Sequence, residues 1–307
     1  MTFDDLPSYS SLSSPVMLPL EIVELIIDLL ARDGHLDALR NCCLTSPQLV
    51  HMCRKHIFST IKAVQERIYS DDYDSDEEVE ELCPNIPHPI ERFGRLLESN
   101  PHISSYVRNL EIGSMLDYNH SFIALQHLYR VTNFTFGFSD SNRLDGWTRD
   151  WGTVSSSIDD SLQSFIQQNT ITTLYLFNIR DLPIHILLGL RFLQHLSVLF
   201  ATVENFQDAS LSWTVPLVNL KTLDLQTRSL RFAEAAMLSS NIFGISALDQ
   251  LCVQFAWFED IEILHRILAL PQSLASLHIF MEGMCIHPLV LFLPPHVTLT
   301  DIPCSQF

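Results

Sequence analysis

The stretch ITTLYL at residues 171–176 has apolar residues at its first, fourth and sixth positions. The same spacing returns in LQHLSV at 193–198, in LKTLDL at 220–225, and in four further segments, at residues 107–112, 131–136, 248–253 and 274–279. Most neighbouring copies start 22 to 28 residues apart, and one interval of 40 residues holds an insertion at about 140–157. A spaced apolar triplet with this period predicts a repeated unit that contains one short strand with one buried face.

The segments between the triplets have a different periodicity. Residues 159–167 and 259–268 show the 3.6-residue spacing of amphipathic helices. Strands and helices that alternate at this period predict an α/β fold, with an irregular solenoid built on a parallel sheet over residues 91–307. No copy has the Asn or Cys that regular repeats carry three positions after the triplet, so we expect irregular turns.

The positions on either side of each buried strand residue face the open side of such a sheet. They carry a mixture of aromatic, amide and acidic side chains, which is typical of protein-binding surfaces rather than of small-molecule pockets. We therefore expect this face to bind a target protein, through Glu111, Tyr175, Phe177, Asp224, Gln226, Gln254, His278 and Phe280. For any single one of these residues, an ordinary solvated sheet surface is the alternative.

The first 60 residues are organised differently. Residues 1–17 are rich in Ser and Pro, which predicts a disordered arm. Three short helices are expected over residues 18–33, 36–44 and 46–59. Pro19 suits a first helical turn, Gly34 suits a helix end, and Ser46 followed by Pro47 suits a helix start. Together the three helices predict a small module at residues 18–60.

The first of these helices has an unusually wide apolar surface. Between residues 21 and 30 only Glu21, Glu24 and Asp28 are polar, and their spacing places them on one narrow stripe. The rest of the helix surface is apolar, formed by Ile22, Val23, Leu25, Ile26, Ile27, Leu29 and Leu30. A three-helix module can cover only part of this surface. The remainder must face either the rest of this chain or another protein, because large apolar patches rarely stay exposed.

Residues 61–90 are expected to form an acidic and Pro-rich linker. The segment SDDYDSDEEVEE at 70–81 carries like charges that repel one another, and Pro84, Pro87 and Pro89 stiffen the chain that follows. Ser75 precedes three acidic residues and would suit an acidophilic kinase. A plain charged linker is the preferred interpretation.

Composition excludes several classes of partner. The 307 residues include 36 acidic and 18 basic ones, for a net charge of −18, which repels nucleic acid and anionic membrane surfaces. No segment has the length and apolar character of a membrane span or a secretory signal, so we expect a soluble protein of the cytoplasm and/or nucleus. The seven cysteines form no CxxC pair and are expected to be reduced thiols.

No motif for catalysis is present. The chain has no GxGxxG, GxxxxGK[ST] or GxSxG sequence, so we expect neither an enzyme nor a bound cofactor. His51 and Cys53 would fall on different faces of the helix expected there, which argues against a metal site with His56. Cys42 and Cys43 lie among the apolar positions of a short helix, where core packing is the expected role.

Several motifs of the first 60 residues match a known family. LPLEIVELIIDLL at 18–30, DALRNCCLTS at 37–46 and RKHIFSTI at 54–61 resemble the three helices of the F-box. RFGRLLESNPHISSYVRNLEI at 92–112 resembles the segment that often follows this motif in F-box/leucine-rich-repeat proteins, and the whole chain is similar to the fungal members of that group. Pro47 stands where the family usually has a basic residue, and Leu49 where it usually has Trp.

The resemblance implies a substrate receptor of a Skp–cullin–F-box ubiquitin ligase. The F-box would dock on a Skp-type adaptor, and through it on a cullin, while the leucine-rich repeats would select an unknown target protein. Carried over position by position, the adaptor contacts would be Leu18, Pro19, Ile22, Ile26, Leu30, Leu39 and Leu44. A ligase-independent interaction scaffold, in which the small module caps the repeats, is the alternative.

Overall fold

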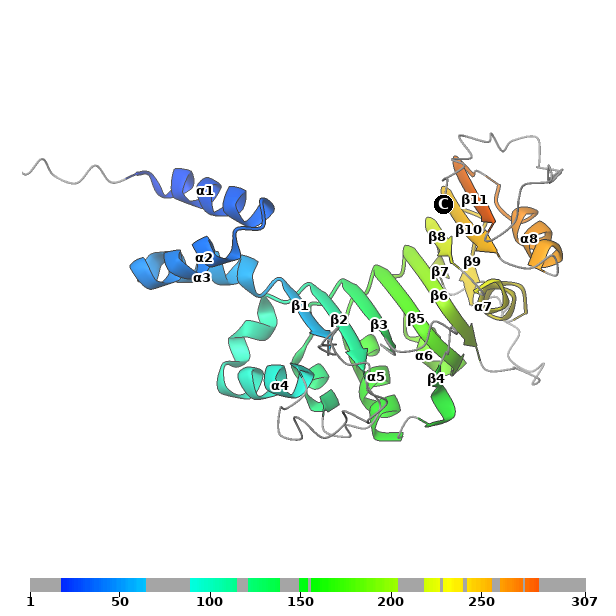
Figure 1. The fold of residues 1–307 in the computed structure, drawn as a ribbon, viewed down its shortest axis with the longest axis horizontal. Coiled ribbons are helices and arrows are strands. Elements are labelled where there is room, and N and C mark those ends of the chain that lie inside the picture. The colour runs from blue at the N-terminus through cyan, green and yellow to red at the C-terminus, as the bar shows by residue number, and fades with distance from the viewer. Residues whose placement is uncertain are drawn as a thin grey trace, which may run out of the picture. The chain divides into compact units, whose positions relative to one another are not determined.

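The computed structural model describes residues 18–64, 89–114, 121–138, 149–153, 156–203, 218–226, 229–239, 242–255, 260–272 and 274–281. The chain divides into two compact units, Met1–Ser59 and Thr60–Phe307, here called unit 1 and unit 2 (Figure 1). The arm expected at residues 1–17 and most of the insertion expected at 140–157 lie outside the described residues.

Unit 1 contains the three expected helices, which are α1 (Leu20–Arg32), α2 (Leu36–Thr45) and α3 (Pro47–Ile57). Helix α1 begins one residue after Pro19, whose carbonyl accepts hydrogen bonds from the Ile22 and Val23 amides. Gly34 lies two residues after the end of α1 and has a φ of 77°, a left-handed conformation that glycine adopts without a steric penalty. Pro47 occupies the first turn of α3, as predicted.

The core of unit 1 is small. Ile27, Leu39 and Cys53, one residue from each helix, are its fully buried members. The apolar residues that pack around them are partly buried: Val23, Leu30, Ala31, Cys42, Cys43, Leu49, Met52 and Ile57. A module of this size therefore covers one side of α1 and cannot cover the whole helix.

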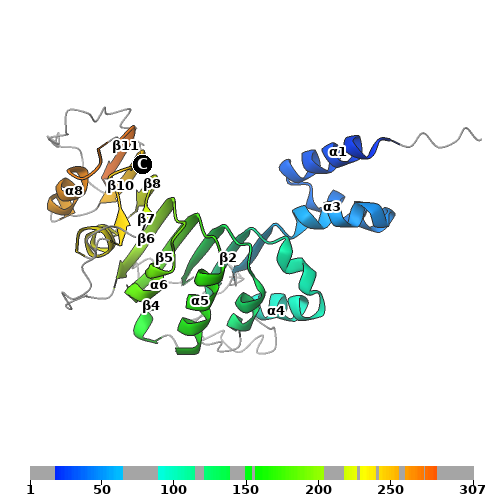
Figure 2. The same ribbon diagram turned by 180° about the vertical axis from the view of Figure 1, so that it is seen from behind.

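Unit 2 is built on a parallel sheet, and the α/β class with a parallel sheet is confirmed. Its main strands follow one another across the sheet in chain order (Figures 1 and 2). They are β1 (Thr60–Val64), β2 (Asn109–Ser114), β3 (Asn133–Phe138), β5 (Thr173–Leu182), β6 (His195–Val203), β8 (Thr222–Leu225), β10 (Gln250–Phe255) and β11 (Ser276–Met281). Short β4 (Arg149–Asp150) pairs with the end of β5, and β7 (Val218–Asn219) pairs with β9 (Phe243–Gly244) in a second sheet.

All seven apolar triplets lie at strands of the main sheet. The first residue of each triplet precedes its strand, and the second and third lie within it. Every triplet residue is buried except Ile279, which is half-buried. Each strand contributes two alternate apolar residues to the core, and the turn before it contributes a third. This is why the triplet spacing predicted the strands.

Strand β1 was not predicted, and the linker expected at residues 61–90 was drawn too wide. Residues 60–64 read TIKAV, have no triplet, and pair with β2 in parallel over five residues. Ala63 is buried there. At the other end, α4 (Pro89–Ser99) begins inside the expected linker and contacts β1. The acidic stretch and Ser75 lie outside the described residues.

The connections between strands are uneven, as expected from the missing turn residues. They contain the helices α5 (Ser156–Gln168), α6 (Ile184–Leu188), α7 (Leu230–Ala233), which continues into the wider turn η6 (Glu234–Ser239), and α8 (Asp260–Leu268). They also contain three 3₁₀ turns: η2 (Pro101–Ser105), η3 (Ser121–His127) and η4 (Trp151–Thr153). Helices α4, α5 and α6 lie along one side of the sheet (Figures 1 and 2).

The core between the sheet and these helices is aromatic on β3. The Phe134 ring lies 5.9 Å from that of Phe136 and 4.9 Å from that of Phe165 on α5, and Trp151 packs 5.9 Å from Phe136. Edge-to-face and stacked pairs of this kind add to the stabilisation from burial. This face of the sheet is therefore closed by side chains of the chain itself.

One buried amide stabilises an irregular turn. Asn169, which follows α5, is 4% exposed. Its Oδ1 accepts a hydrogen bond from the Val131 amide, and its Nδ2 donates to the carbonyls of Leu128 and Phe165. The side chain thus satisfies backbone groups before β3 and at the end of α5, which would otherwise be buried without partners.

Candidate interaction surfaces

The exposed surface of α1 combines the charged residues Glu21, Glu24, Asp28 and Arg32 with a group of large apolar side chains. Val23, Ile27 and Leu30 face the core of unit 1. Away from this core, α1 and the residue two positions before it expose six large apolar side chains, each between 39% and 57% accessible: Leu18, Leu20, Ile22, Leu25, Ile26 and Leu29. We call these six residues the apolar face of α1. Such a face costs free energy in water, since soluble proteins rarely expose contiguous apolar patches without a function.

The expected adaptor contacts fall into three groups. Leu18, Ile22 and Ile26 lie on the apolar face of α1, and Pro19 is exposed beside it. Leu44, near the end of α2, is 85% exposed. Leu30 is half-buried against the core, and Leu39 is fully buried in it. Leu39 therefore stabilises the module from within and is not available at its surface in this structure.

Three residues of the apolar face were not among the expected contacts. Leu20, Leu25 and Leu29 are as exposed as Ile22. Leu25 and Leu29 follow Ile22 by three and seven positions, so they lie on the same side of a helix. That spacing is visible in the sequence, but the side that faces the core is decided by α2 and α3.

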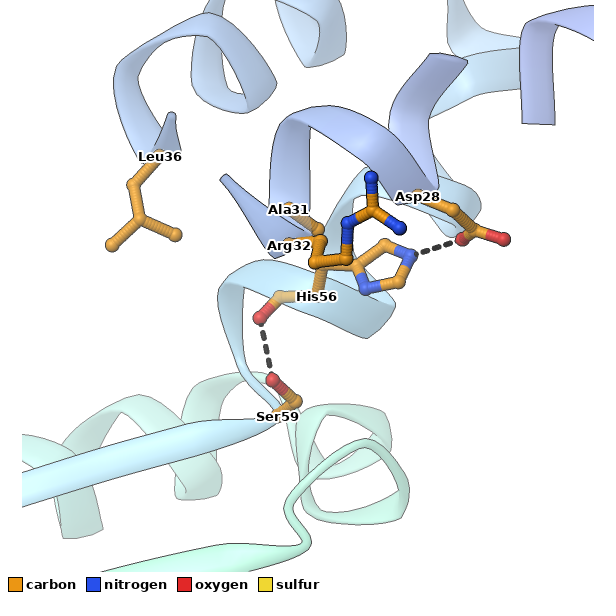
Figure 3. Close-up of a pocket in the computed structure, with 6 residues that line it drawn as sticks. All are labelled: Asp28, Ala31, Arg32, Leu36, His56 and Ser59. Carbon is orange, nitrogen blue, oxygen red and sulfur yellow. Dashed lines mark hydrogen bonds and ion pairs between the residues drawn. The ribbon is translucent and has the colours of Figure 1, made fainter. Parts of the chain in front are cut away.

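A polar pocket lies where α1 ends. It has a volume of about 290 Å³ and is lined by Asp28, Ala31, Arg32, Leu36, His56 and Ser59 (Figure 3). The His56 Nε2 atom lies 2.7 Å from Asp28 Oδ1, and the Ser59 hydroxyl donates to the His56 carbonyl at 2.7 Å. Figure 3 shows the Arg32 side chain beside the His56 ring. These contacts connect α1 to the end of α3.

The cysteines of unit 1 pack together around its core. Cys53 is fully buried, and Cys42 and Cys43 pack against it. Burial, together with the neighbouring Cys43 and Cys42 thiols, raises the pKa of Cys53 from 9.0 to about 12. Cys53 is therefore a neutral thiol at physiological pH, which is the poorly nucleophilic form. Within the described ranges, no three His, Cys, Asp or Glu side chains are grouped as a metal site.

The open face of the unit 2 sheet carries a continuous row of polar and aromatic side chains. The strand register aligns one residue from each main strand, in the order Lys62, Glu111, Thr135, Tyr175, Ser197, Asp224, Cys252 and His278. We call this the central row. Lys62 Nζ lies 3.4 Å from Glu111 Oε2 at one end, and the Ser276 hydroxyl lies 2.9 Å from His278 Nε2 at the other.

The eight expected target-binding residues are brought together on this face. Glu111, Tyr175, Asp224 and His278 belong to the central row. Phe177, Gln226, Gln254 and Phe280 each lie two positions further along the chain from a row member. Thr135, Ser197 and Cys252 were missed, although each is the fifth residue of its six-residue triplet segment, as Tyr175 and Asp224 are.

Two aromatic side chains form a rigid pair on the face. The Tyr175 and Phe177 rings are stacked, with centroids 5.7 Å apart and planes inclined by 26°. Phe177 lies over Gly137 of the neighbouring strand, where a Cβ atom would collide with the Phe177 ring and carbonyl oxygen. Glycine at this position therefore allows the close approach of the ring to the strand.

Asp224 interacts with several neighbouring members of the central row. Its Oδ2 accepts hydrogen bonds from the Ser197 hydroxyl at 3.1 Å and from the Gln226 amide at 2.8 Å. Its Oδ1 is buried and has no hydrogen-bond partner among the described residues. Burial and the Asp224 charge raise the pKa of Tyr175, and they raise the pKa of Cys252 to about 12. Cys252 is therefore a neutral thiol, and the row offers charge, hydrogen bonds and ring surface.

None of the helices in the described part of the chain has the length and apolar character that a bilayer span requires. Comparison with models of known protein families finds none that matches this chain. A search of curated proteins likewise finds no matching relative. The two surfaces are therefore interpreted from their own chemistry.

Proposed function

We propose that this chain is the substrate-recognition adaptor of a Skp–cullin–F-box ubiquitin ligase. Unit 1 docks on the Skp-type adaptor through the apolar face of α1, and the open sheet face of unit 2 binds the target protein. The observation that carries the proposal is the apolar face of α1, with six large side chains left exposed by a three-helix unit.

The packing of unit 1 supports a docking role for this face. The three helices already fill their shared core with Ile27, Leu39 and Cys53, so the exposed side chains have no further site inside the unit. Apolar surface removed from water stabilises a complex by about 25 cal/mol per Å² before the costs of association are subtracted. A partner with an apolar groove therefore gains most by covering Ile22, Leu25 and Leu29 together.

Unit 2 supports the second half of the proposal. Its own helices cover one side of the sheet, and no helix of the described residues covers the other side, where the central row runs across eight strands. Neighbouring strands are about 4.8 Å apart, so the row is about 34 Å long. A surface of this length suits an extended segment of a protein better than a small molecule.

Co-purification of the full chain with a Skp-type adaptor tests the proposal. We expect the wild-type chain to capture the adaptor and the double variant Ile22→Asp, Ile26→Asp to lose it, because two charges would be buried in an apolar interface. Both side chains are more than 40% exposed, so the variant is expected to keep its fold.

Phe192→Asp is the matched control. Phe192 is 58% exposed in unit 2, so its replacement also removes a large exposed apolar side chain, away from α1. This variant should capture the adaptor as the wild type does, and circular dichroism should show all three proteins folded. A folded wild-type chain that captures no adaptor would overturn the proposal and leave a ligase-independent scaffold.

A further inference from the structure

At the centre of the open sheet face a ring and a carboxylate lie on either side of a small residue, and we call this three-residue position the notch. Strand register places Ser197 directly between Tyr175 and Asp224. Because neighbouring strands are about 4.8 Å apart, the backbones of Tyr175 and Asp224 are separated by about 10 Å. The small Ser197 side chain fills little of this space, and all three residues are half-buried.

The carboxylate in this notch lacks a positive partner. Its partners in the described part of the chain are neutral groups: the Ser197 hydroxyl and the Gln226 amide donate to Oδ2, and the Cys252 thiol also bonds the carboxylate. A partly desolvated carboxylate with no cation close by raises the free energy of the unbound protein. A positively charged group of a partner would remove this cost.

The aromatic side of the notch restricts which cation fits. The Tyr175 ring is held against Phe177, and Phe177 is held over Gly137, so the pair is ordered before any partner arrives. A guanidinium group is planar and can stack on an aromatic ring while it donates a hydrogen bond to a neighbouring carboxylate oxygen, whereas an ammonium group has no planar surface for stacking.

We propose that the open sheet face of unit 2 binds an extended segment of a partner protein and seats an arginine side chain of that segment over Ser197, between the Tyr175–Phe177 pair and Asp224. The guanidinium stacks on the Tyr175 ring and donates to Asp224 Oδ2, because Oδ1 is buried. The inference rests on the proposed function in taking this face as the target-binding surface, and it adds the chemistry by which a target is recognised.

The test uses the immobilised full chain and an array of random peptides of about ten residues, each about 33 Å long when extended. Every peptide carries one central arginine and is paired with the same peptide carrying citrulline, the neutral isostere of arginine. We expect a subset of the arginine peptides to bind, and their citrulline counterparts to bind at least about tenfold more weakly.

Two variants of the notch and one control sharpen the test. Asp224→Asn should reduce the binding of arginine peptides to the level of their citrulline counterparts. Ser197→Leu, which places a larger side chain over the notch and keeps the Asp224 charge, should do the same. Asp249→Asn removes one carboxylate from an exposed position of the same unit and should retain the preference. Thermal unfolding of each variant checks that the fold is kept.

The inference is overturned if no peptide binds, if citrulline peptides bind as well as arginine peptides, or if the preference survives Asp224→Asn. Adaptor capture is measured on the same samples. A chain that captures the adaptor but has no arginine preference fails this inference alone. A chain that prefers arginine and captures no adaptor fails the ligase proposal alone.

Discussion

Units 1 and 2 differ in how completely they bury their apolar residues. In unit 1, helix α1 covers the core with one side and exposes six apolar side chains on the other. In unit 2, the triplet residues of the sheet are buried under the helices, and the open face carries polar and aromatic groups instead. Unit 1 therefore presents an apolar surface, which would be stabilised by burial, whereas unit 2 presents a surface of mixed chemistry on its sheet.

The largest effect on stability is expected from a substitution in the core of unit 2, and it would show how much that core depends on its buried side chains. Phe134→Ala removes a buried ring that contacts Phe136 and Phe165. The free energy of unfolding should fall by about 3–5 kcal/mol, from lost burial and the cavity left behind. All four tryptophans lie after residue 60, so tryptophan fluorescence in a urea titration reports on unit 2 alone. A loss below about 1 kcal/mol would contradict this description of the core.

A somewhat smaller effect is expected in unit 1. Leu39→Ala should destabilise unit 1 by about 2–4 kcal/mol, because Leu39 is one of only three fully buried residues there. Hydrogen exchange of residues 20–57 should accelerate, while tryptophan fluorescence stays unchanged. The matched variant Leu44→Ala, at a side chain that is 85% exposed, should change stability by less than about 0.5 kcal/mol. Equal hydrogen-exchange rates in Leu39→Ala and Leu44→Ala would contradict the assignment of Leu39 to the core of unit 1.

The smallest effect concerns the buried thiol of unit 1. The folded chain holds the pKa of Cys53 at about 12, against an ordinary value of 9.0. Between pH 9 and pH 12 the Cys53 thiol is deprotonated in the unfolded chain and protonated in the folded chain. Its contribution to the free energy of unfolding is therefore fully present below pH 9 and is lost as the pH rises towards 12. The slope is at most about 1.4 kcal/mol per pH unit.

Urea unfolding of unit 1 at pH 8 and pH 10, followed by helical circular dichroism, measures this slope. Cys53→Ala lacks the titrating group and should show a shallower loss of stability than the wild type between the two pH values. Parallel losses in the two proteins would exclude the Cys53 thiol as the source.

Local sequence predicted most of the main strands and the helices of unit 1, but not which distant segments contact one another. The triplets located seven strands, and Pro47 and Gly34 marked helix ends, because these signals act within a few residues. Strand β1 escaped detection because TIKAV is short and becomes a strand by pairing with β2, about 50 residues later. Asn169 escaped for a similar reason, since its amide bonds backbone groups as far away as Leu128.

The candidate surfaces divide in the same way. The width of the apolar arc on α1 is a property of residues 21–30 alone, and it indicated that part of the helix would stay exposed. Which part stays exposed was decided by α2 and α3. Their packing took Leu39 and Leu30 into the core and left Leu20, Leu25 and Leu29 on the surface.

The sequence by itself determined the period, seven of the main strands and the residue types that these strands place on the open sheet face, because periodicity and turn chemistry are local. Only the tertiary structure decided that Tyr175, Ser197 and Asp224 lie side by side, since strand register joins residues from three separate repeats. The physical reason is that a parallel sheet forms its hydrogen bonds between distant segments, so the alignment of their side chains exists only after folding.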